Sequence, residues 1–411
     1  MPTTTPENVG ISSERLERIA PAMQSWIEQG TISGASMMIA RRGQLVYDEN
    51  IGHLYKDGQT PVASDSIFRI YSMTKPIICT ALMTFYEEGR FQLKTPLARF
   101  IPMLGDLKVH QTDESGNASE VAATWPITVG ALMSHTAGFT YDFLFDSPVC
   151  ELYRQARIGN NAGRTLEQFV KDLATLPLAY QPDSTWHYSV SIDVAAYLLQ
   201  VLADKPLRDV LQERIFTPLG MSDTDFCVPE EKLPRLAGMY GVGDLVAPDM
   251  TLITMFNNWQ NGVHEELDVS KTYPTDNPAV FQRGGHGLYS TPQDYMRFAM
   301  MLYHNGILDG QRILGRKTLE LMHANSVPAN LMPLMLGGIP MSGYGFGMGS
   351  RAMMDVGLAG MPGSVGEYGW AGAATTYYWV DPVEEMVGLG RIEGKTEEME
   401  SWQRRGRRVE S

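Results

Sequence analysis

The chain has 411 residues, of which 44% are hydrophobic and 19% charged, and its formal net charge is −14 at pH 7. This composition is typical of a globular protein with a substantial core and excludes a disordered chain. The negative charge argues against binding to nucleic acids or anionic membranes, both of which need a basic surface. No apolar run approaches the roughly 18–20 residues of a membrane span.

The N-terminal residues and the cysteines indicate the compartment. The first residues lack the basic and apolar regions of a signal peptide. The three cysteines, Cys79, Cys150 and Cys227, are odd in number and widely spaced. They indicate buried thiols in a reducing compartment, and neither a disulfide framework nor a metal site. We therefore expect a cytoplasmic protein.

The first ninety residues have the pattern of an α/β protein. Apolar residues recur at helical spacing over 11–29, which predicts an amphipathic helix. Residues 34–40 and 44–47 predict two short strands, joined by a tight turn at 41–43. A third extended stretch, 67–70, leads to the next helix.

That helix opens with Tyr71-Ser72-Met73-Thr74-Lys75-Pro76, is apolar on nearly every side, and ends at Gly89, which suits a left-handed helix end. A helix that is apolar all round is buried. Ser72 and Lys75, three residues apart, share one helical face about 5–6 Å apart at Cβ. A neutral lysine there can activate the serine as a nucleophile. The alternative is a serine helix cap followed by a solvated lysine.

Residues 91–284 differ in character, because strand patterns become rare and helical segments dominate. The predicted helices span 127–134, 164–175, 191–204 and 206–216. No internal repeat or linker-like stretch separates this region from its surroundings. We therefore expect a mainly helical lobe inserted into the α/β part.

The α/β pattern returns near residue 284. Residues 290–294 have the capping hydroxyl, proline and acid of a helix start, and the helix is predicted to run over 295–304. Residues 374–380 and 386–389 predict a second hairpin. We expect the first and last hairpins to pair in one antiparallel sheet flanked by helices, with the cleft between this part and the lobe.

The sequence thus predicts one catalytic domain over 1–411. Its parts are an α/β part at about 1–90 and 285–390, a helical lobe at about 91–284, and a polar tail at 391–411. Trp402 is the only aromatic side chain of the tail, which is almost wholly polar beyond Ile392. We expect this tail to be poorly ordered or weakly docked.

Two further stretches carry candidate functional groups. Tyr188 lies just before the buried helix at 191, where it is either a core aromatic or a proton relay between the lysine and the serine. Residues 369–373 are expected to enter the 374–380 strand directly, and a glycine there allows close approach of the backbone to a bound acyl group. The backbone N–H groups of Ser72 and Ala373 would then form a two-donor oxyanion hole.

Three motifs, Ser72–Lys75, Tyr188–Val190 and Trp370–Gly372, in this order resemble those of class C β-lactamases and penicillin-binding proteins. The sequence is most similar to the family VIII carboxylesterases, which share that fold. The stretches 132–139 and 284–290 also match, and the resemblance covers about residues 10 to 390. It implies a serine β-lactamase-like α/β (α+β) fold and no metal or organic cofactor.

The resemblance also implies residue roles. Ser72 would be the nucleophile, and Lys75 with Tyr188 the proton-transfer pair. The oxyanion and substrate-binding positions would be Ser72, Ala373, Trp370, Ala371, Gly372 and Val190. Nothing in the family uses a histidine as a triad base, so His135 and His286 are interpreted as structural and hydrogen-bonded. Residues 363–366 imitate a Gly-x-Ser-x-Gly elbow, but Pro362 occupies the first glycine position.

Departures from the family motifs indicate the substrate class. β-Lactamases have asparagine where this chain has Val190, and lysine where it has Trp370. The chain therefore lacks charge-assisted contacts to a β-lactam, of roughly 1.5–3 kcal/mol each. A tryptophan at the mouth of the cleft suits an uncharged, apolar ester.

We therefore expect a carboxylesterase acting on small, short-acyl esters. The alternatives are a β-lactamase or D-amino-acid peptidase, an acyltransferase using the same acyl-enzyme, and a non-catalytic penicillin-binding sensor. The sequence gives no natural substrate and no oligomeric state.

Overall fold

The structure is a computed structural model, and it describes residues 1–30, 32–144, 146–159, 162–241, 265–276, 279–280 and 282–394. Its centre is a seven-stranded sheet with the strand order β13-β14-β15-β16-β17-β1-β2, in which every neighbouring pair is antiparallel. The expected fold class, an antiparallel sheet flanked by helices, is confirmed.

The N-terminal elements are α1 (Ser13–Leu16), α2 (Ile19–Glu28), β1 (Ile32–Arg41) and β2 (Gln44–Gly52). The helix expected over 11–29 is thus divided in two, while the hairpin lies where it was expected. Arg42 and Gly43 in its turn both have positive φ, at 50° and 76°, as a two-residue type I′ turn requires.

The C-terminal strands are β13 (Tyr344–Phe346), β14 (Arg351–Met353), β15 (Tyr368–Gly372), β16 (Thr376–Asp381) and β17 (Met386–Gly394). β17 pairs with β1, with Leu389 opposite Met38, which confirms that the first and last hairpins share one sheet. One expectation is wrong: residues 369–373 do not enter β16 directly, because a turn with Thr375 at φ 56° separates β15 from β16.

The tail predicted for 391–411 begins inside a strand. The backbone of β17 continues to Gly394, five residues beyond the strand end expected from the sequence. Residues 395–411, on which the prediction of a poorly ordered or weakly docked tail depends, lie outside the described residues.

The central helix begins with a 3-10 turn, Tyr71–Met73, and continues as α3 (Thr74–Glu87). Every residue from Thr74 to Met83 is buried, as expected for a helix without a polar face. Gly89 follows its end with φ 71°, which is the left-handed helix end that the sequence predicts.

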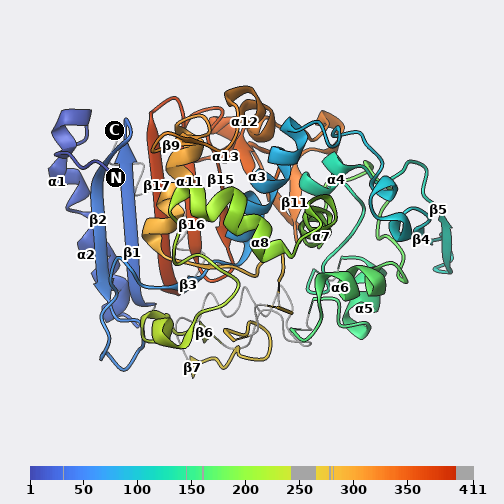
Figure 1. The fold of residues 1–411 in the computed structure, drawn as a ribbon, viewed down its shortest axis with the longest axis horizontal. Coiled ribbons are helices and arrows are strands. Elements are labelled where there is room, and N and C mark those ends of the chain that lie inside the picture. Colours follow the sequence, from blue (N-terminus) through green and yellow to red (C-terminus); the bar gives the residue numbers. More distant parts are fainter. Residues whose placement is uncertain are drawn as a thin grey trace.

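The sheet is covered on both faces, because its central strands alternate their side chains between two apolar clusters. Met37 and Ile39 of β1 pack with α1 and α2, whereas Met38 and Ala40 face α3 and α11 (Pro292–Tyr303). Figure 1 shows these two helical layers on opposite sides of the sheet. The threonine cap and the proline expected at the start of α11 are both present.

The α-helices in the described part of 91–284 are α4 (Val129–Met133), α5 (Pro148–Gln155), α6 (Leu166–Leu173), α7 (Ser191–Ala203), α8 (Leu207–Leu211) and α9 (Thr217–Leu219). The sequence did not predict α5 or the hairpin of β4 (Lys108–Thr112) and β5 (Ala118–Ala122). One apolar cluster includes side chains of α3, α7 and β16. We therefore propose that this lobe and the sheet form a single catalytic domain.

The remaining elements are short. They are β3 (Phe68–Arg69), β6 (Tyr240–Gly241), β7 (Glu265–Glu266), β8 (Tyr289–Ser290), β9 (Ile307–Leu308), β10 (Gln311–Arg312), α12 (Arg316–His323), β11 (Leu334–Leu336), β12 (Ile339–Met341) and α13 (Val356–Ala359). β3 leads to the Ser72 turn and pairs with β8. No helix within the described ranges is both long enough and apolar enough to span a bilayer.

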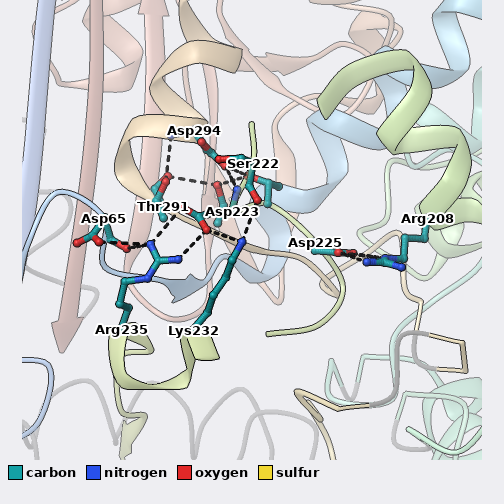
Figure 2. Close-up of polar contacts among 11 residues, drawn as sticks. Asp65, Arg208, Ser222, Asp223, Asp225, Lys232, Arg235, Thr291 and Asp294 are labelled. Atoms are coloured by element: carbon teal, nitrogen blue, oxygen red, sulfur yellow. Dashed lines mark hydrogen bonds and ion pairs between the residues drawn. The ribbon is translucent and has the colours of Figure 1, made fainter. Parts of the chain in front are cut away.

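Charged side chains gather beside β3 and β8. Asp223 accepts hydrogen bonds from Lys232 and Arg235, each at 2.7 Å, and Arg235 also pairs with Asp65. Asp294 in the first turn of α11 accepts from the backbone N–H of Asp223 at 2.8 Å. Figure 2 shows Lys232 and Arg235 converging on Asp223. We call these five residues the Asp223 cluster.

Candidate active site

Ser72 lies in a strained and firmly held turn between β3 and α3. Tyr71 has φ 40°, in a left-handed region that bulky residues rarely adopt. Its side chain is buried against the ring of Tyr273, with 5.0 Å between the centroids. The Tyr295 hydroxyl of α11 donates to the Met73 carbonyl at 2.9 Å. Ser72 itself is only partly buried, unlike Tyr71 and Met73 on either side of it.

Lys75 is the buried cation of the site. It is 1% exposed, and its Nζ donates to Ser72 Oγ at 3.0 Å and to the Gly285 carbonyl at 2.7 Å. The rings of Tyr188 and Tyr141 flank the ammonium, with centroids at 4.5 and 5.5 Å. These contacts fix Nζ beside the serine, as the three-residue spacing predicts.

Tyr188 reaches the same serine from the segment before α7. Its hydroxyl donates to Ser72 Oγ at 2.7 Å, and its ring packs against His135 and Trp370 at 4.7 and 5.6 Å. The structure therefore brings Ser72, Lys75 and Tyr188 together, although Tyr188 is 116 residues from the serine. We call these three residues the Ser72 centre.

The side chain of Trp370 on β15 is buried, at 5% exposure, so the expectation of a tryptophan at the mouth of the cleft is wrong. Phe346 packs edge-on against the indole at 5.1 Å. The indole Nε1–H of Trp370 donates a hydrogen bond to the Tyr188 hydroxyl oxygen, with 3.4 Å between the nitrogen and the oxygen. The indole therefore places a neutral donor beside the Tyr188 hydroxyl.

The end of β15 lies directly against the backbone that leads to Ser72. A Cβ on Gly372 would lie 2.3 Å from the Ile70 carbonyl oxygen, so the glycine accommodates the protein's own backbone. Ala371 and Ala373 at this end are partly exposed, and Ala373 lies in the turn after the strand. Val190 is buried at the start of α7.

The two candidate histidines lie outside the Ser72 centre, His135 fully buried and His286 partly buried. His135 Nδ1 lies 3.3 Å from the Ser189 hydroxyl, while Nε2 has no hydrogen-bond partner among the described residues. Burial, with the charge of Lys75, holds the pKa of His135 well below its ordinary value. Burial likewise lowers the pKa of His286 to about 3. Both are neutral at physiological pH, which agrees with a structural interpretation.

Sequence reasoning missed two groups next to Lys75. Gly285 contributes a backbone carbonyl, which no side-chain pattern reveals. Asp193 of α7 is buried at 2% exposure and accepts from the Gly285 N–H at 2.9 Å. An acid in the first turn of an otherwise apolar, buried helix was the available signal.

The described residues include no group of three or more His, Cys, Asp or Glu side chains that could hold a metal ion. The three cysteines are free thiols. Burial raises the pKa of Cys227 to about 11 and that of Cys150 above its ordinary value. These thiols are therefore protonated and poorly nucleophilic at neutral pH.

Comparisons with known proteins cover nearly the whole chain. A family model described as Beta-lactamase matches residues 17–392. An uncharacterized protein of Mycobacterium tuberculosis is 31% identical over 375 residues, which cover 89% of this chain and 87% of that protein. Esterase EstB of Burkholderia gladioli is 25% identical over 379 residues, covering 89% and 86% of the two chains.

The solved structure of EstCE1, described as a hydrolase with promiscuous acyltransferase activity, is also similar. It aligns with a TM-score of 0.77 and 25% sequence identity, and the alignment covers 96% of this chain and 98% of EstCE1.

Proposed function

The chain belongs to the β-lactamase family, and from this premise we propose that it is a serine carboxylesterase that hydrolyses small, short-chain acyl esters. The observation that carries the proposal is the convergence on Ser72 Oγ, which lies 3.0 Å from Lys75 Nζ and 2.7 Å from the Tyr188 hydroxyl. A hydroxyl held by two proton-transfer groups is the arrangement of an activated nucleophile.

The reaction would proceed through an acyl-enzyme. Ser72 Oγ attacks the ester carbonyl while its proton passes to the Lys75–Tyr188 pair. The Ser72 and Ala373 N–H groups stabilise the oxyanion, and the pair returns the proton to the leaving alcohol. Water then attacks the acyl-enzyme by the same proton path in reverse.

Two side chains support an ester over a β-lactam. Val190 is buried and offers no amide to a substrate. Trp370 donates its indole N–H to Tyr188, so it provides no cation for a substrate carboxylate. The similarity to Esterase EstB agrees with this preference.

Acyl transfer is the second candidate, and the similarity to EstCE1, a hydrolase with promiscuous acyltransferase activity, favours it. An acyltransferase would pass the acyl group from Ser72 to an alcohol in preference to water. Adding an alcohol during ester turnover and measuring the new ester against the free acid separates the two.

The free thiols also bear on where the enzyme acts. Cys79 and Cys150 are buried and unpaired with another cysteine, which fits a reducing compartment. We place the enzyme in the cytoplasm. Fractionation of the source cells, with the chain found outside the cytoplasm, would contradict this assignment.

The experiment that tests the function measures initial rates for p-nitrophenyl acetate and butyrate beside a chromogenic cephalosporin, for the wild type and Ser72→Ala. We expect ester turnover that the variant loses, and little cephalosporin cleavage. Cephalosporin cleavage at rates rivalling the esters would indicate an amide hydrolase of the lactamase or D-amino-acid peptidase type. Labelling by a serine-reactive acyl probe without turnover would indicate a penicillin-binding sensor.

A further inference from the structure

Asp193 is a buried carboxylate beside the Ser72 centre that the proposed mechanism does not use. It is the third residue of α7 and is 2% exposed. Its Oδ1 accepts a hydrogen bond from the backbone N–H of Gly285 at 2.9 Å. Burying a carboxylate is unfavourable unless nearby groups compensate for the lost hydration. Its position therefore needs an explanation.

Gly285 links this carboxylate to the lysine. Its N–H donates to Asp193, and its carbonyl accepts from Lys75 Nζ at 2.7 Å. The same glycine thus holds the carboxylate on one side and the ammonium on the other. A change in the position of Gly285 would move the acceptor that fixes Nζ beside Ser72.

The contact is built without intervening side chains. A Cβ on Gly285 would lie 2.6 Å from Asp193 Oδ2 and 2.7 Å from the Tyr141 hydroxyl oxygen. A Cβ on Gly284 would lie 2.3 Å from the Ile192 carbonyl oxygen. All three distances are too short for real Cβ contacts, so the glycines let the loop backbone lie directly on the first turn of α7.

The charges of Asp193 and Lys75 influence each other in this buried environment. Burial raises the pKa of Asp193, while the Gly285 N–H and the charges of Lys75 and Arg283 oppose that rise. Tyr141 faces the same carboxylate, and burial together with the charge of Asp193 raises the pKa of that phenol. Asp193 therefore interacts electrostatically with two buried cations and has a neutral phenol beside it.

Further groups face the ammonium from α3 itself and from two other segments of the chain. The charge of Lys75 acts to lower the pKa of each of three neighbours, but burial has the larger effect on each. Burial lowers the pKa values of the two histidines further and raises that of the cysteine. These neighbours are Cys79, His135 and His286. They are neutral at physiological pH, so none of them supplies a counter-charge to the lysine.

We propose that Asp193 is a positioning residue for the acyl-transfer chemistry, which acts through the Gly285 peptide to fix Lys75 and supplies its buried negative counter-charge. This inference rests on the proposed function, because it assigns Lys75 a part in proton transfer. A purely structural role is the alternative, since an acid in the first turn of a helix also stabilises that helix.

Asp193→Asn separates these roles. The amide oxygen still accepts from Gly285 N–H, but the charge is gone. Without the charge an ammonium at Lys75 is less stabilised, so the acid limb of the kcat/KM profile for p-nitrophenyl butyrate should move to lower pH by at least about half a unit. The plateau should fall by about two- to threefold, because the amine is a weaker base, while KM changes little.

Asp294→Asn is the matched control. Asp294 is also the third residue of a helix and is buried, with 6% exposure. It accepts a hydrogen bond from the backbone N–H of Asp223 at 2.8 Å. This variant should lose thermal stability to a similar degree as Asp193→Asn, yet keep the wild-type pH profile. An unmoved acid limb in Asp193→Asn, with only its thermal midpoint lowered, would overturn the proposal.

Gly285→Ala tests the same contact from its other side and serves where Asp193→Asn does not fold. The added methyl group must displace Asp193 or Tyr141, so kcat should fall by at least about tenfold through misplacement of the lysine. A wild-type kcat would overturn the proposal. Ser72→Ala is run in parallel: ester turnover surviving in that variant would instead refute the proposed function itself.

Discussion

The Asp223 cluster and the Ser72 centre are both built from polar side chains near β3 and β8, but their hydrogen bonds are arranged differently. In the cluster, Asp223 faces Lys232 and Arg235, so opposite charges neutralise one another. In the Ser72 centre, an ammonium and a phenol both donate to one serine oxygen. The charges of the cluster are paired with one another, so it has a structural role. The Ser72 centre instead holds a reactive oxygen on a partly exposed residue. The comparison indicates that reactivity lies where polar groups converge on one atom and their charges are not paired with opposite charges.

The largest expected effect comes from Ser72→Ala. The variant should lose essentially all ester turnover, a loss on the order of 10⁴-fold or more for a nucleophile, while its thermal midpoint changes little. Kinetics and thermal unfolding on the same preparation check this. Ser364→Ala is the control. Ser364 lies after Pro362 in the segment that resembles a Gly-x-Ser-x-Gly elbow, and this variant should keep the wild-type ester turnover. The reverse pattern would move the nucleophile to Ser364.

Tyr188→Phe comes next. The variant keeps the ring packed against His135 and Trp370 but removes the 2.7 Å hydrogen bond to Ser72. We expect kcat to fall by at least about 10²-fold, the scale of general acid–base catalysis, and Lys75→Ala to show a similar loss. Tyr180→Phe, whose hydroxyl lies 3.5 Å from the Asp146 carbonyl, serves as control. A near-normal rate in Tyr188→Phe would remove this tyrosine from the mechanism.

Asp223→Asn should affect stability and not chemistry. Hydrogen bonds from Arg235, and further ones from Lys232, hold the pKa of Asp223 below its ordinary 3.8. The ionised carboxylate therefore stabilises the fold above that pH, and the contribution is lost as the pH falls through the lowered, folded-state pKa. We expect about 1–2 kcal/mol less unfolding free energy at pH 7, a value discounted for partial exposure, with normal kcat.

Urea unfolding at pH 7 and at pH 3 measures this effect, and the difference from wild type should shrink at the lower pH. Glu213→Gln breaks the exposed pair with Lys205 and should change stability less. If Asp223→Asn instead lowered kcat strongly at unchanged stability, the division of the molecule into a structural cluster and a reactive centre would fail.

The smallest effect is expected for Trp370→Phe, which removes the 3.4 Å donor to Tyr188. One neutral hydrogen bond contributes about 0.5–1.5 kcal/mol, so kcat should fall about 2- to 10-fold. Trp379→Phe on β16, whose ring packs in the cluster on the other face of the sheet, is the matched control. Equal kcat in the two variants would mean that the indole N–H does not act on the centre.

Much of the fold was predictable, because it is encoded locally. The apolar run after Ser72 predicted α3, and the Arg42–Gly43 turn predicted the first hairpin. β15 was missed because its glycine-rich segment, Tyr368–Gly372, has a weak strand signal and gains order from β14 and β16. The division of the N-terminal helix has a local signal that the apolar periodicity does not show, because Pro21 in the first turn of α2 lacks the N–H that an unbroken helix would need.

The candidate site was predictable to a different extent at each residue. The Ser72–Lys75 contact follows from helical spacing, whereas Tyr188 was found through its motif, since no local pattern links residues 116 apart. The burial of Trp370 required the positions of Phe346 and Tyr188 in space. The bridge from Asp193 to Lys75 runs through backbone atoms of Gly285, which residue identity cannot reveal.

The measurement that tests the central claim most directly is the site of the covalent intermediate. The enzyme is mixed with p-nitrophenyl butyrate, quenched in acid during turnover, digested and mapped by mass spectrometry. The account predicts a butyryl group on the peptide that contains Ser72, and none on that peptide in Ser72→Ala. Steady turnover with the acyl group on another residue, or undiminished turnover by Ser72→Ala, would contradict it.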